Sequence, residues 1–398
     1  MTKNTKILII NSGSSSIKYQ LIEMPSEHLL CKGLVERIGE HDALLKYESG
    51  SVSYEIKESI TAHKSALQKI IEILLDPEKG VIKNSDDIEI VGHRVVHGGN
   101  SFSKTTRITD EVKEKIREHA VLAPLHNPHN LEGILLAEEF FTRAQQVAVF
   151  DTAFHQTIPL KTKKYAIPNE FFDKHKIQLY GFHGTSHKYV SEQAKVHLNP
   201  TDSKLISIHL GNGCSITAIH NGKSLDHSLG FAPSNGLIMG SRSGDIDHAI
   251  IFYLVNNLGY NLEEVNQMLI KESGMLGLTG YNDLRDIEAQ AEKGNKKCIL
   301  ALEMNAYRIK KYIGAYAAAM NGVDAVIFTA GIGENSSTLR ALICRDMDYL
   351  GIHLDTKTNA YKSNEMRAIH KEASQVKLLV IPTNEELEIA KQTFHLLN

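Results

Sequence analysis

The chain has 398 residues, which is enough for two domains that each bury a sizeable core. Its hydrophobic content of 42%, charged content of 23% and formal net charge of −3 are those of a soluble globular protein. They exclude a chain-wide positive field, so we expect neither nucleic acid nor a membrane as a partner.

The cysteines and the apolar runs indicate the compartment. The four cysteines lie far apart without a C-x-x-C pair, which disfavours disulfides and a structural zinc site. The only apolar run near the start is Ile7–Ile10, and no stretch approaches the roughly 20 apolar residues of a membrane span. We therefore expect a cytoplasmic protein.

The stretch Lys6–Leu21, KILIINSGSSSIKYQL, predicts a strand, a tight polar turn and a returning strand. Hydroxyl and amide side chains crowd this turn, and Gly13 lets backbone N–H groups approach a bound group. Such a turn suits a phosphate or its metal. An ordinary polar hairpin turn is the alternative.

The rest of the first half predicts alternating strands and helices. In chain order we expect strands within Leu29–Tyr54, a helix within Ser59–Leu75, a strand at Ile88–His97, a helix capped by Thr109 that runs to Ala120, a loop with Pro124 and Pro128, a helix from about Asn130 to Phe141, and a strand at Gln146–Phe150.

The second half repeats the strand-turn-strand device at Leu205–Ile219, LISIHLGNGCSITAI. A third Gly-rich turn, Thr329–Asn335, is expected between the strand Ala325–Phe328 and a helix. We also expect helices at Ile246–Leu258, Leu262–Glu272 and Asp286–Met320, a last strand at Val376–Ile381, and a terminal helix capped by Asn384. The repeat suggests two related halves that face one nucleotide.

This alternation predicts α/β layers, in which ligands gather at the carboxyl ends of strands. Asn11, Arg94, Asp151, Gly211 and Gly331 each lie at or just after the end of an apolar strand-like run. We therefore expect one composite cleft, with the domain boundary just beyond Asp151.

Two common nucleotide motifs are incomplete. Gly222-Lys223-Ser224 lacks the first glycine of a Walker A loop, because Thr217 occupies its position, and predicts a hairpin turn instead. Gly331-Ile332-Gly333 lacks the third glycine of a dinucleotide fingerprint, where Ser336 stands. NAD binding is therefore not indicated.

Arginines and histidines beside glycines are candidates for binding anions. Arg94 offers a guanidinium fork that matches a carboxylate or phosphate, and Arg242 is a second such residue, although surface arginines remain the alternative. His183 and His187 are four residues apart without an H-E-x-x-H arrangement, which disfavours zinc. We interpret His183 as a group that stabilises developing negative charge and His187 as structural.

Eight motifs in register carry a resemblance over nearly the whole chain. They are NSGSSSIK (residues 11–18), GHRVVHGG (92–99), APLHNP (123–128), VFDTAFH (149–155), GFHGTSH (181–187), HLGNG (209–213), TAGIGEN (329–335) and TNEEL (383–387). Together they resemble the acetokinase family of acetate and propionate kinases.

The resemblance implies an α/β fold of the actin, hexokinase and Hsp70 superfamily, with two related actin/ribonuclease-H-like domains and a nucleotide cleft between them. The expected domains are residues 1–151, on which the terminal helix 385–398 packs, and residues 152–384 for nucleotide binding and dimerisation. The implied reaction is reversible phosphoryl transfer from ATP to acetate, giving acetyl phosphate and ADP. It requires Mg²⁺, with Mn²⁺ as a substitute, in a homodimer.

The resemblance also assigns roles to residues of this chain. Asn11 and Glu385 match the magnesium positions, Lys18 an ATP contact, Arg94 the contact to the substrate carboxylate, Asp151 the catalytic acid or base, and His183 and Arg242 the stabilisers of the transition state. The nucleotide-binding positions are His209, Leu210, Gly211, Asn212, Gly213, Asp283, Leu284, Arg285, Gly331, Ile332, Gly333, Glu334 and Asn335. The positions around the acyl group are Val96, Leu125, His126, Phe182 and Pro233.

Direct in-line transfer agrees with elementary chemistry. The carboxylate of acetate is already ionised at neutral pH, since its pKa is near the value of about 4.3 for glutamate. We therefore expect Asp151 to orient a metal-bound water or an arginine rather than to move a proton.

Three alternatives stay open at this point. The first alternative is an enzyme that prefers propionate or a longer acid. The second is a non-catalytic ATP-binding protein of the same superfamily. The third is that other purine nucleotides replace ATP. It follows from departures from the family pattern, such as His227 in place of the usual threonine and a shorter Gly280–Arg285 loop.

Overall fold

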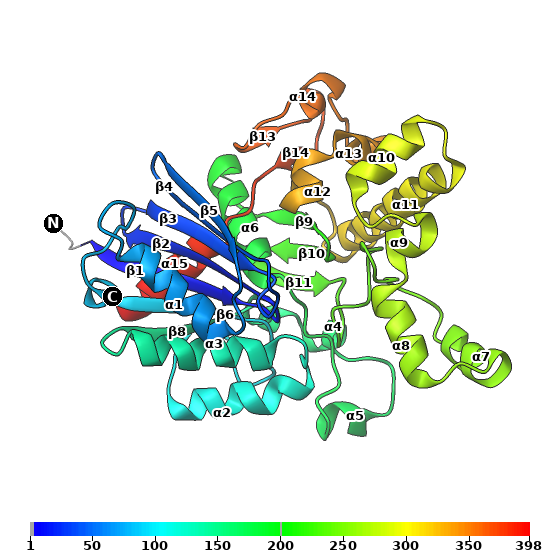
Figure 1. The fold of residues 1–398 in the computed structure, drawn as a ribbon. Coiled ribbons are helices and arrows are strands. Elements are labelled where there is room, and N and C mark those ends of the chain that lie inside the picture. The colour runs from blue at the N-terminus through cyan, green and yellow to red at the C-terminus, as the bar shows by residue number, and fades with distance from the viewer. Residues whose placement is uncertain (1–3, 200) are drawn as a thin grey trace. The chain divides into compact units, whose positions relative to one another are not determined.

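The computed structural model describes residues 4–199 and 201–398 (Figure 1). The chain divides into two compact units. The first unit runs to Phe154 and includes Asn384–Asn398, and the second unit comprises His155–Thr383. These limits lie beside the expected boundaries at Asp151 and residue 384, and the assignment of the two parts as domains stays a prediction.

The first unit is built on an eight-stranded sheet. Its strands are β1 (Thr5–Ser12), β2 (Ser16–Met24), β3 (His28–Glu36), β4 (Ala43–Ser49), β5 (Val52–Glu58), β6 (Ile90–Val95), β7 (Thr106–Arg107) and β8 (Gln145–Phe150). Its helices are α1 (His63–Leu74), η1 (Ser85–Asp87), α2 (Asp110–Glu118), η2 (His119–Val121), α3 (Asn127–Phe140) and α15 (Glu385–Leu397).

Alternating side chains divide the core of the first unit between the two faces of the sheet. Leu8 and Ile10 of β1 belong to the core that includes residues of α1 and α3. Ile7 and Ile9 point the other way and pack with Ile389 of α15. The period of two in β1 thus places α15, red in Figure 1, on the face opposite α1 and α3.

The second unit is built on a six-stranded sheet. Its strands are β9 (Lys204–Leu210), β10 (Cys214–His220), β11 (Lys223–His227), β12 (Ala325–Thr329), β13 (Arg367–Ala368) and β14 (Lys377–Val380). Its helices are α4 (Leu160–Lys163), α5 (Asn169–Asp173), α6 (Gly184–Leu198), α7 (Ala249–Leu258), α8 (Leu262–Lys271), α9 (Gly274–Thr279), α10 (Leu284–Glu292), α11 (Lys296–Ala319), α12 (Ala330–Asn335), α13 (Ser337–Cys344), η4 (Asp348–Leu350) and α14 (Thr356–Ala360), while η3 (Ala153–Thr157) spans the limit between the units.

The two sheets repeat one topology. The order is β5-β4-β3-β2-β1-β6-β8-β7 in the first and β11-β10-β9-β12-β14-β13 in the second. In each, a strand pairs antiparallel with its hairpin partner (β1 with β2, β9 with β10) and parallel with a later strand (β1 with β6, β9 with β12). The predicted α/β fold with two related halves is confirmed.

Three predicted elements differ from the structure. The helix expected over Asp286–Met320 is broken into α10 and α11 at Gly294, whose φ of +87° is left-handed, and Asn295 caps α11. Helix α3 begins at Asn127 rather than near Asn130, because Pro128 fits the first turn, where no N–H donor is needed.

The third difference concerns the Gly-rich stretch after β12. Residues expected to form a turn form the short helix α12, which follows β12 directly. Gly333 lies against the strand, since a Cβ there would be 3.4 Å from the carbonyl carbon of Phe328. Gly333 thus lies within a helix that packs on the strand rather than in an open turn.

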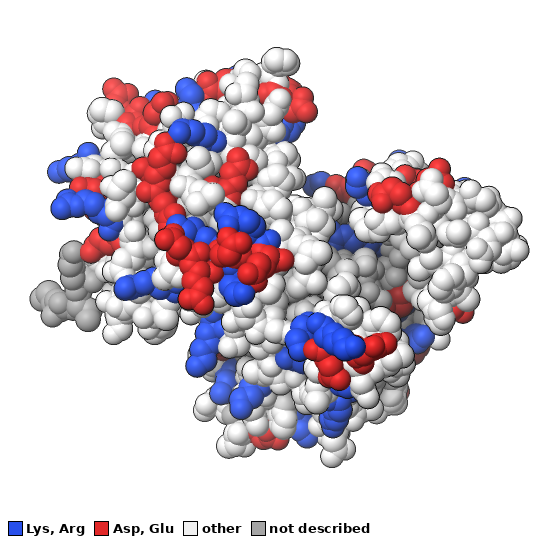
Figure 2. Space-filling view, turned by 90° about the horizontal axis from the view of Figure 1, so that it is seen from below, with Lys and Arg blue, Asp and Glu red and all other residues white. Residues whose placement is uncertain are grey.

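The surface and the thiols agree with the composition. The face in Figure 2 carries acidic and basic side chains in mixed clusters. Cys31, Cys214, Cys298 and Cys344 are buried free thiols. Within residues 4–199 and 201–398, no helix has the length and apolar content needed to cross a membrane.

Candidate active site

Three predicted site residues meet at the carboxyl ends of parallel strands in the first unit. Asn11 lies at the end of β1, Arg94 near the end of β6, and Asp151 directly after β8. Arg94 Nε donates to Asp151 Oδ1 and Oδ2 at 3.1 and 3.0 Å, and Nη2 donates to Oδ2 at 2.5 Å. Arg94 Nη1 lies 3.4 Å from Asn11 Oδ1. The parallel order thus brings together residues 83 positions apart in the sequence.

The first turn of α15 adds carboxylates to this cluster. Asn384 caps the helix by accepting a hydrogen bond from the Leu387 N–H at 3.0 Å, as predicted. Burial raises the pKa of Glu385 to about 7, against the lowering effect of Arg94 and with the help of Asp151. Burial lowers the pKa of Arg94, but the charges of Asp151 and Glu385 raise it above its ordinary value overall.

Lys18 lies on β2 next to the first polar turn. Its Nζ forms an ion pair with Glu386 Oε1 at 2.7 Å, and its side chain remains 50% exposed. Gln20 Nε2 donates to the other oxygen of Glu386 at 3.4 Å. In the turn itself, the Gly13 N–H donates to the Ser16 carbonyl at 2.8 Å. Glu386 therefore fixes Lys18 beside the turn, which is a contact that the sequence did not predict.

His183 is held in a left-handed conformation at the start of α6, with a φ of +55°. Its Nδ1 lies 2.9 Å from Ser215 Oγ, and its ring stacks on His209 with a centroid distance of 4.4 Å. Gly213 lies against the ring, since a Cβ there would be 3.4 Å from His183 Cε1. The turn after β9 thus lies at van der Waals distance from the imidazole at Gly213.

Two further histidines, His187 and His227, contact residues next to His183. His227 Nε2 accepts a hydrogen bond from the Phe182 N–H at 3.1 Å, so the ring proton is on Nδ1, which lies 2.7 Å from Thr217 Oγ1. His187 is buried between Ser207 and Ser215 hydroxyls, in the structural role predicted for it. Burial and neighbouring histidines lower the pKa values of His187 and His227 well below 6.5, so both rings are neutral.

Arg242 lies in the segment that follows Met239-Gly240. Its Nη1 donates to the Pro233 carbonyl at 2.7 Å, and burial lowers its pKa from the ordinary arginine value. This backbone contact directs the side chain, and the guanidinium has further N–H groups that can bind an anion.

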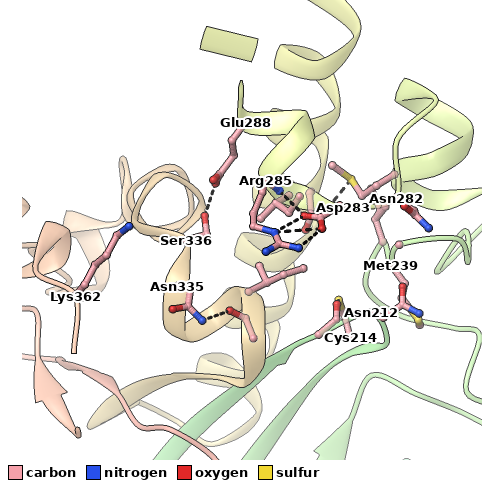
Figure 3. A pocket seen from close by; sticks show the side chains of 18 residues that line it. Asn212, Cys214, Met239, Asn282, Asp283, Arg285, Glu288, Asn335, Ser336 and Lys362 are labelled. Atoms are coloured by element: carbon pink, nitrogen blue, oxygen red, sulfur yellow. Dashed lines mark hydrogen bonds and ion pairs between the residues drawn. The ribbon is translucent and has the colours of Figure 1, made fainter. Parts of the chain in front are cut away.

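A cavity of 820 Å³ opens in the second unit (Figure 3). This volume is within the range of sites for small molecules and cofactors. Of the predicted nucleotide positions, those that line it are Gly211, Asn212, Asp283, Leu284, Arg285, Gly331, Ile332 and Asn335. They come from the turn after β9, the start of α10 and helix α12, and Figure 3 labels Asn212, Asp283, Arg285 and Asn335 among them.

Hydrogen bonds order the wall of this cavity. Asp283 caps α10 by accepting from the Arg285 N–H at 2.9 Å, and it also accepts from Arg285 Nε at 3.0 Å. The side-chain and backbone hydrogen bonds from Arg285 lower the pKa of Asp283 to about 2. Asn335 Nδ2 donates to the Gly331 carbonyl at 2.8 Å, and Ser336 donates to Glu288. These hydrogen bonds hold Asp283, Arg285 and Asn335 in place at the wall.

The other predicted nucleotide positions do not belong to the described lining of the cavity. They are His209, Leu210, Gly213, Gly333 and Glu334. The Glu334 carboxylate accepts from the Thr383 N–H at 3.1 Å. The buried Arg340 donates to the Gly333 and Glu334 carbonyls at 2.8 and 3.0 Å. These contacts give Glu334 and Gly333 a role in holding α12, and direct nucleotide contact stays a prediction for them.

The predicted acyl positions are divided between the units. Val96 is buried in the first unit, with its N–H donating to Asn130 Oδ1 at 3.0 Å, whereas Leu125 is 61% exposed and His126 precedes α3. Phe182 is buried in the second unit, which also contains Pro233. A common apolar pocket formed by these residues stays a prediction.

The sequence matches the family model described as the acetokinase family over residues 6–391. The chain belongs to the acetokinase family. It is 60% identical over 392 residues to the acetate kinase of Flavobacterium johnsoniae, covering 98% of this chain and 99% of that protein. The acetate kinase of Treponema denticola is 49% identical over 395 residues, covering 98% and 99%.

Solved structures agree with the acetokinase assignment. The crystal structure of Porphyromonas gingivalis acetate kinase is similar with a TM-score of 0.94 and 44% identity, covering 99% of this chain and 100% of that one. A propionate kinase from Francisella tularensis has a TM-score of 0.91 and 41% identity, covering 98% and 99%. The resemblance inferred from the eight motifs is confirmed.

Sequence reasoning on this acetokinase missed part of the cavity. The missed lining residues are Cys214, Ile238, Met239, Gly240, Met275, Asn282, Glu288, Asn305, Ser336 and Lys362. Ser336 directly follows the TAGIGEN motif, and Met239-Gly240 directly precedes Ser241-Arg242, so adjacency to a motif was an available signal for these. Glu288, Asn305 and Lys362 carried no such signal.

Proposed function

We propose that this acetokinase transfers the γ-phosphoryl group of ATP to acetate, reversibly, giving acetyl phosphate and ADP. The observation that carries the proposal is the cluster of Asn11, Arg94, Asp151 and Glu385 at the carboxyl ends of β1, β6 and β8. It combines a guanidinium for a carboxylate with oxygen donors for a cation. The names of the full-length relatives support the same reaction.

Arg94 binds the acetate carboxylate. Asp151 accepts hydrogen bonds from Nε and from one N–H of Nη2, which fixes the plane of the guanidinium. The N–H groups that face away from Asp151, on Nη1 and Nη2, are then presented as a fork to the substrate. Asp151 is in this view a positioning residue for Arg94, since the ionised acetate has no proton to give up.

The reaction is an in-line displacement. A carboxylate oxygen of acetate attacks the γ-phosphorus, the bond from phosphorus to the β–γ bridging oxygen breaks, and ADP leaves with that electron pair. His183 and Arg242 stabilise the negative charge on the transferring group. The serine behind His183 Nδ1 orients the ring so that Nε2 is the nitrogen directed at that charge.

The donor set of the first unit fits Mg²⁺. Asp151, Glu385 and Glu386 supply three carboxylates against the two cations Arg94 and Lys18, and burial has raised the pKa of Glu385 to about 7. Asn11 Oδ1 and the Glu385 carboxylate are the hard oxygen ligands that Mg²⁺ and Mn²⁺ prefer, and they would hold the ion. When bound, the ion would neutralise charge on the phosphates.

The cavity of the second unit is the proposed site for the nucleotide. Arg285 and Lys362 provide positive charge at its wall, and Ile238, Met239 and Ile332 provide apolar surface for a base. The apolar side chains suit a nucleobase, and the two cations suit its phosphates. Competition between ATP and GTP in the assay below tests whether other purine nucleotides serve.

We also propose that the protein is a homodimer through α7, α8 and α11. These helices carry exposed large apolar side chains, namely Ile250, Phe252, Tyr253, Leu258, Leu262, Leu300 and Tyr307. The right-hand edge of Figure 2, where α7 lies, is mostly free of charged side chains. Light scattering of Phe252→Asp against the unchanged chain tests this interface, and a mass of twice the chain mass for both proteins would refute it.

The experiment for the reaction is an acyl phosphate assay. The protein is incubated with Mg-ATP and acetate, propionate or butyrate, and the product is trapped with hydroxylamine as the hydroxamate. A strong signal with acetate, less with propionate and little with butyrate is expected. A propionate signal above that of acetate would favour the propionate alternative, which the similarity to a propionate kinase motivates. No hydroxamate from any acid, with ATP still bound, would favour a non-catalytic ATP-binding protein.

A further inference from the structure

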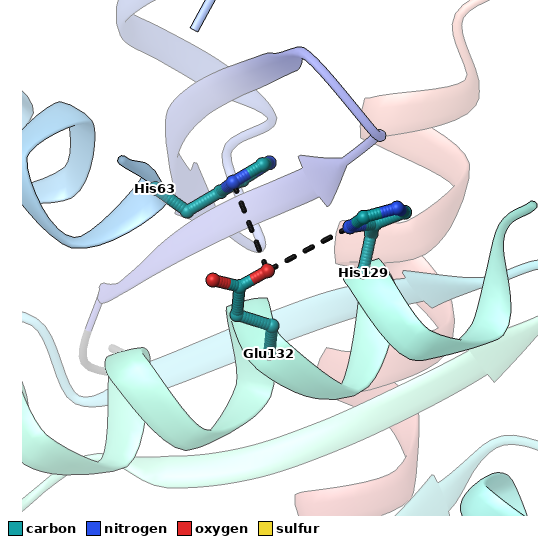
Figure 4. A group of neighbouring side chains, drawn as sticks. All are labelled: His63, His129 and Glu132. Atoms are coloured by element: carbon teal, nitrogen blue, oxygen red, sulfur yellow. Dashed lines mark ion pairs between the residues drawn. The ribbon is translucent and has the colours of Figure 1, made fainter. Parts of the chain in front are cut away.

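Outside the proposed active site, three potential metal ligands converge in the first unit (Figure 4). They are His63, the first residue of α1, and His129 and Glu132, which are three residues apart on α3. Glu132 Oε2 lies 3.7 Å from His63 Nδ1 and 3.6 Å from His129 Nδ1. One donor atom from each residue can be chosen so that all lie within 4.8 Å of one another.

The proton of His63 can be assigned from its partners. His63 Nε2 lies 2.7 Å from the Gly13 carbonyl oxygen, and a carbonyl only accepts, so Nε2 carries the proton. In the neutral ring, Nδ1 therefore presents a lone pair to the carboxylate oxygen of Glu132. Two electron-rich atoms that face each other at this distance favour a cation between them. A ring N–H held by a backbone carbonyl is also the usual support of a metal-binding histidine.

The spacing fits a small tetrahedral site. Bonds of about 2.0–2.1 Å from a metal to nitrogen or oxygen place neighbouring donors roughly 3.4 Å apart. The two rings lie nearly parallel, with centroids 5.7 Å apart and an interplanar angle of 16°, so small side-chain rotations bring both Nδ1 atoms to that separation. Three protein ligands would leave a fourth position for water.

We propose that His63, His129 and Glu132 bind Zn²⁺ or a similar first-row transition-metal ion, at a site separate from the oxygen donors for Mg²⁺. Two imidazoles and one carboxylate suit Zn²⁺, Co²⁺ or Ni²⁺, whereas Mg²⁺ prefers oxygen ligands and retains its waters. The ligand set thus separates the two kinds of ion by chemistry. The proposal does not depend on the reaction proposed above.

The site is connected to the polar turn of the NSGSSSIK motif. His63 holds the Gly13 carbonyl of this turn, and from α3 Asn130 Nδ2 donates to the Ser12 carbonyl at 2.8 Å. Gly133 of α3 packs against Ser12, since a Cβ there would lie 2.8 Å from the Ser12 Cβ. An ion bound by residues of both α1 and α3 would therefore stabilise the conformation of this turn.

Zinc titration of the metal-free, full-length protein tests the proposal, with excess Mg²⁺ present to fill oxygen sites. We expect one tight Zn²⁺ per chain and a rise in the melting temperature. His129→Ala and Glu132→Gln should each weaken binding by at least about 10- to 100-fold and abolish the rise. Both side chains are partly exposed, so these variants leave the fold intact. His41→Ala, at an exposed histidine of the same unit, is the matched control and should bind as the unchanged chain does.

Cobalt provides a second readout that is independent of activity. Co²⁺ bound by nitrogen and oxygen in a tetrahedral site has a visible absorption spectrum, which Zn²⁺ should remove by competition and which His129→Ala should lack. Zinc affinity in His129→Ala and Glu132→Gln equal to that of the His41→Ala control would overturn the proposal. So would the absence of tight zinc binding, in which case the three residues form only a protonation-dependent ion pair. The hydroxamate assay reports separately on the proposed reaction.

Discussion

Asp151→Asn is the substitution that tests the proposed active site most directly. The carboxylate receives Arg94 Nε and Nη2 at 2.5–3.1 Å in a bidentate pair. In the asparagine variant one oxygen becomes an amide NH₂, which points donor against donor at the guanidinium. At least one charge-assisted hydrogen bond is lost, at about 1.5–3 kcal/mol.

If Asp151 acts by orienting Arg94, that loss is expected in kcat/KM for acetate. The expected decrease is roughly 10- to 150-fold, because about 1.4 kcal/mol corresponds to a factor of ten. The KM for ATP should change little, since the cavity proposed for the nucleotide lies in the second unit. Initial rates of hydroxamate formation, with acetate and ATP varied in turn, measure both quantities.

The matched control is Asp86→Asn. Asp86 also pairs with an arginine of the first unit, Arg143, at 2.9 Å, but this pair is exposed. It should leave kcat/KM for acetate unchanged. Acetate kinetics of Asp151→Asn within twofold of the unchanged chain would refute both the positioning role and the acid–base role of Asp151.

Three further predictions concern the second unit. Burial raises the pKa of Asp226 from 3.8 to about 6, so the stabilisation of the folded state by the protonated carboxyl group is complete below pH 3.8 and is lost as the pH rises through 6. Asp226→Asn should therefore raise the free energy of unfolding by up to about 3 kcal/mol above pH 7 and leave it unchanged near pH 3.5. A difference in urea unfolding that does not depend on pH would contradict this. His227→Thr removes the acceptor of the Phe182 N–H, and the loss of this hydrogen bond costs about 1 kcal/mol. We expect kcat to fall about fivefold and His227→Gln to restore part of it. An unchanged kcat would show that the hydrogen bond is dispensable. Arg285→Ala removes the exposed guanidinium that Asp283 holds at the cavity wall. It should raise the KM for ATP several-fold and leave kcat for acetate unchanged. A raised KM for acetate instead would show that Arg285 acts elsewhere in the reaction.

The sequence determined the local structure wherever a short pattern was sufficient. Alternation in Lys6–Leu21 predicted β1, its turn and β2, and cap residues predicted the starts of α2 at Thr109 and α15 at Asn384. The meeting of Asn11, Arg94 and Asp151 was also predictable. Carboxyl ends of parallel neighbouring strands share one edge of a sheet, whatever the length of chain between them.

Residue-type patterns predicted the wrong local structure where two backbone conformations were equally compatible with the sequence. Gly294 is compatible with a helix interior or with a helix end, and its left-handed φ in the structure ends α10 there. The glycines of TAGIGEN predicted a turn, but the stretch forms the helix α12, in which Gly333 lies against β12. Such choices depend on the packing surface, which a local window does not contain.

Only the tertiary structure decided which distant side chains share an environment. Glu288 and Lys362 line one cavity, and His63 lies beside Glu132, although no spacing in the sequence relates either pair. The pKa of Glu385 depends in the same way on burial and on the charges of Arg94, Asp151 and Lys18. The sequence thus determined the chemistry of each group and its strand or helix. Distances, burial and protonation followed from the fold, because they depend on neighbours far along the chain.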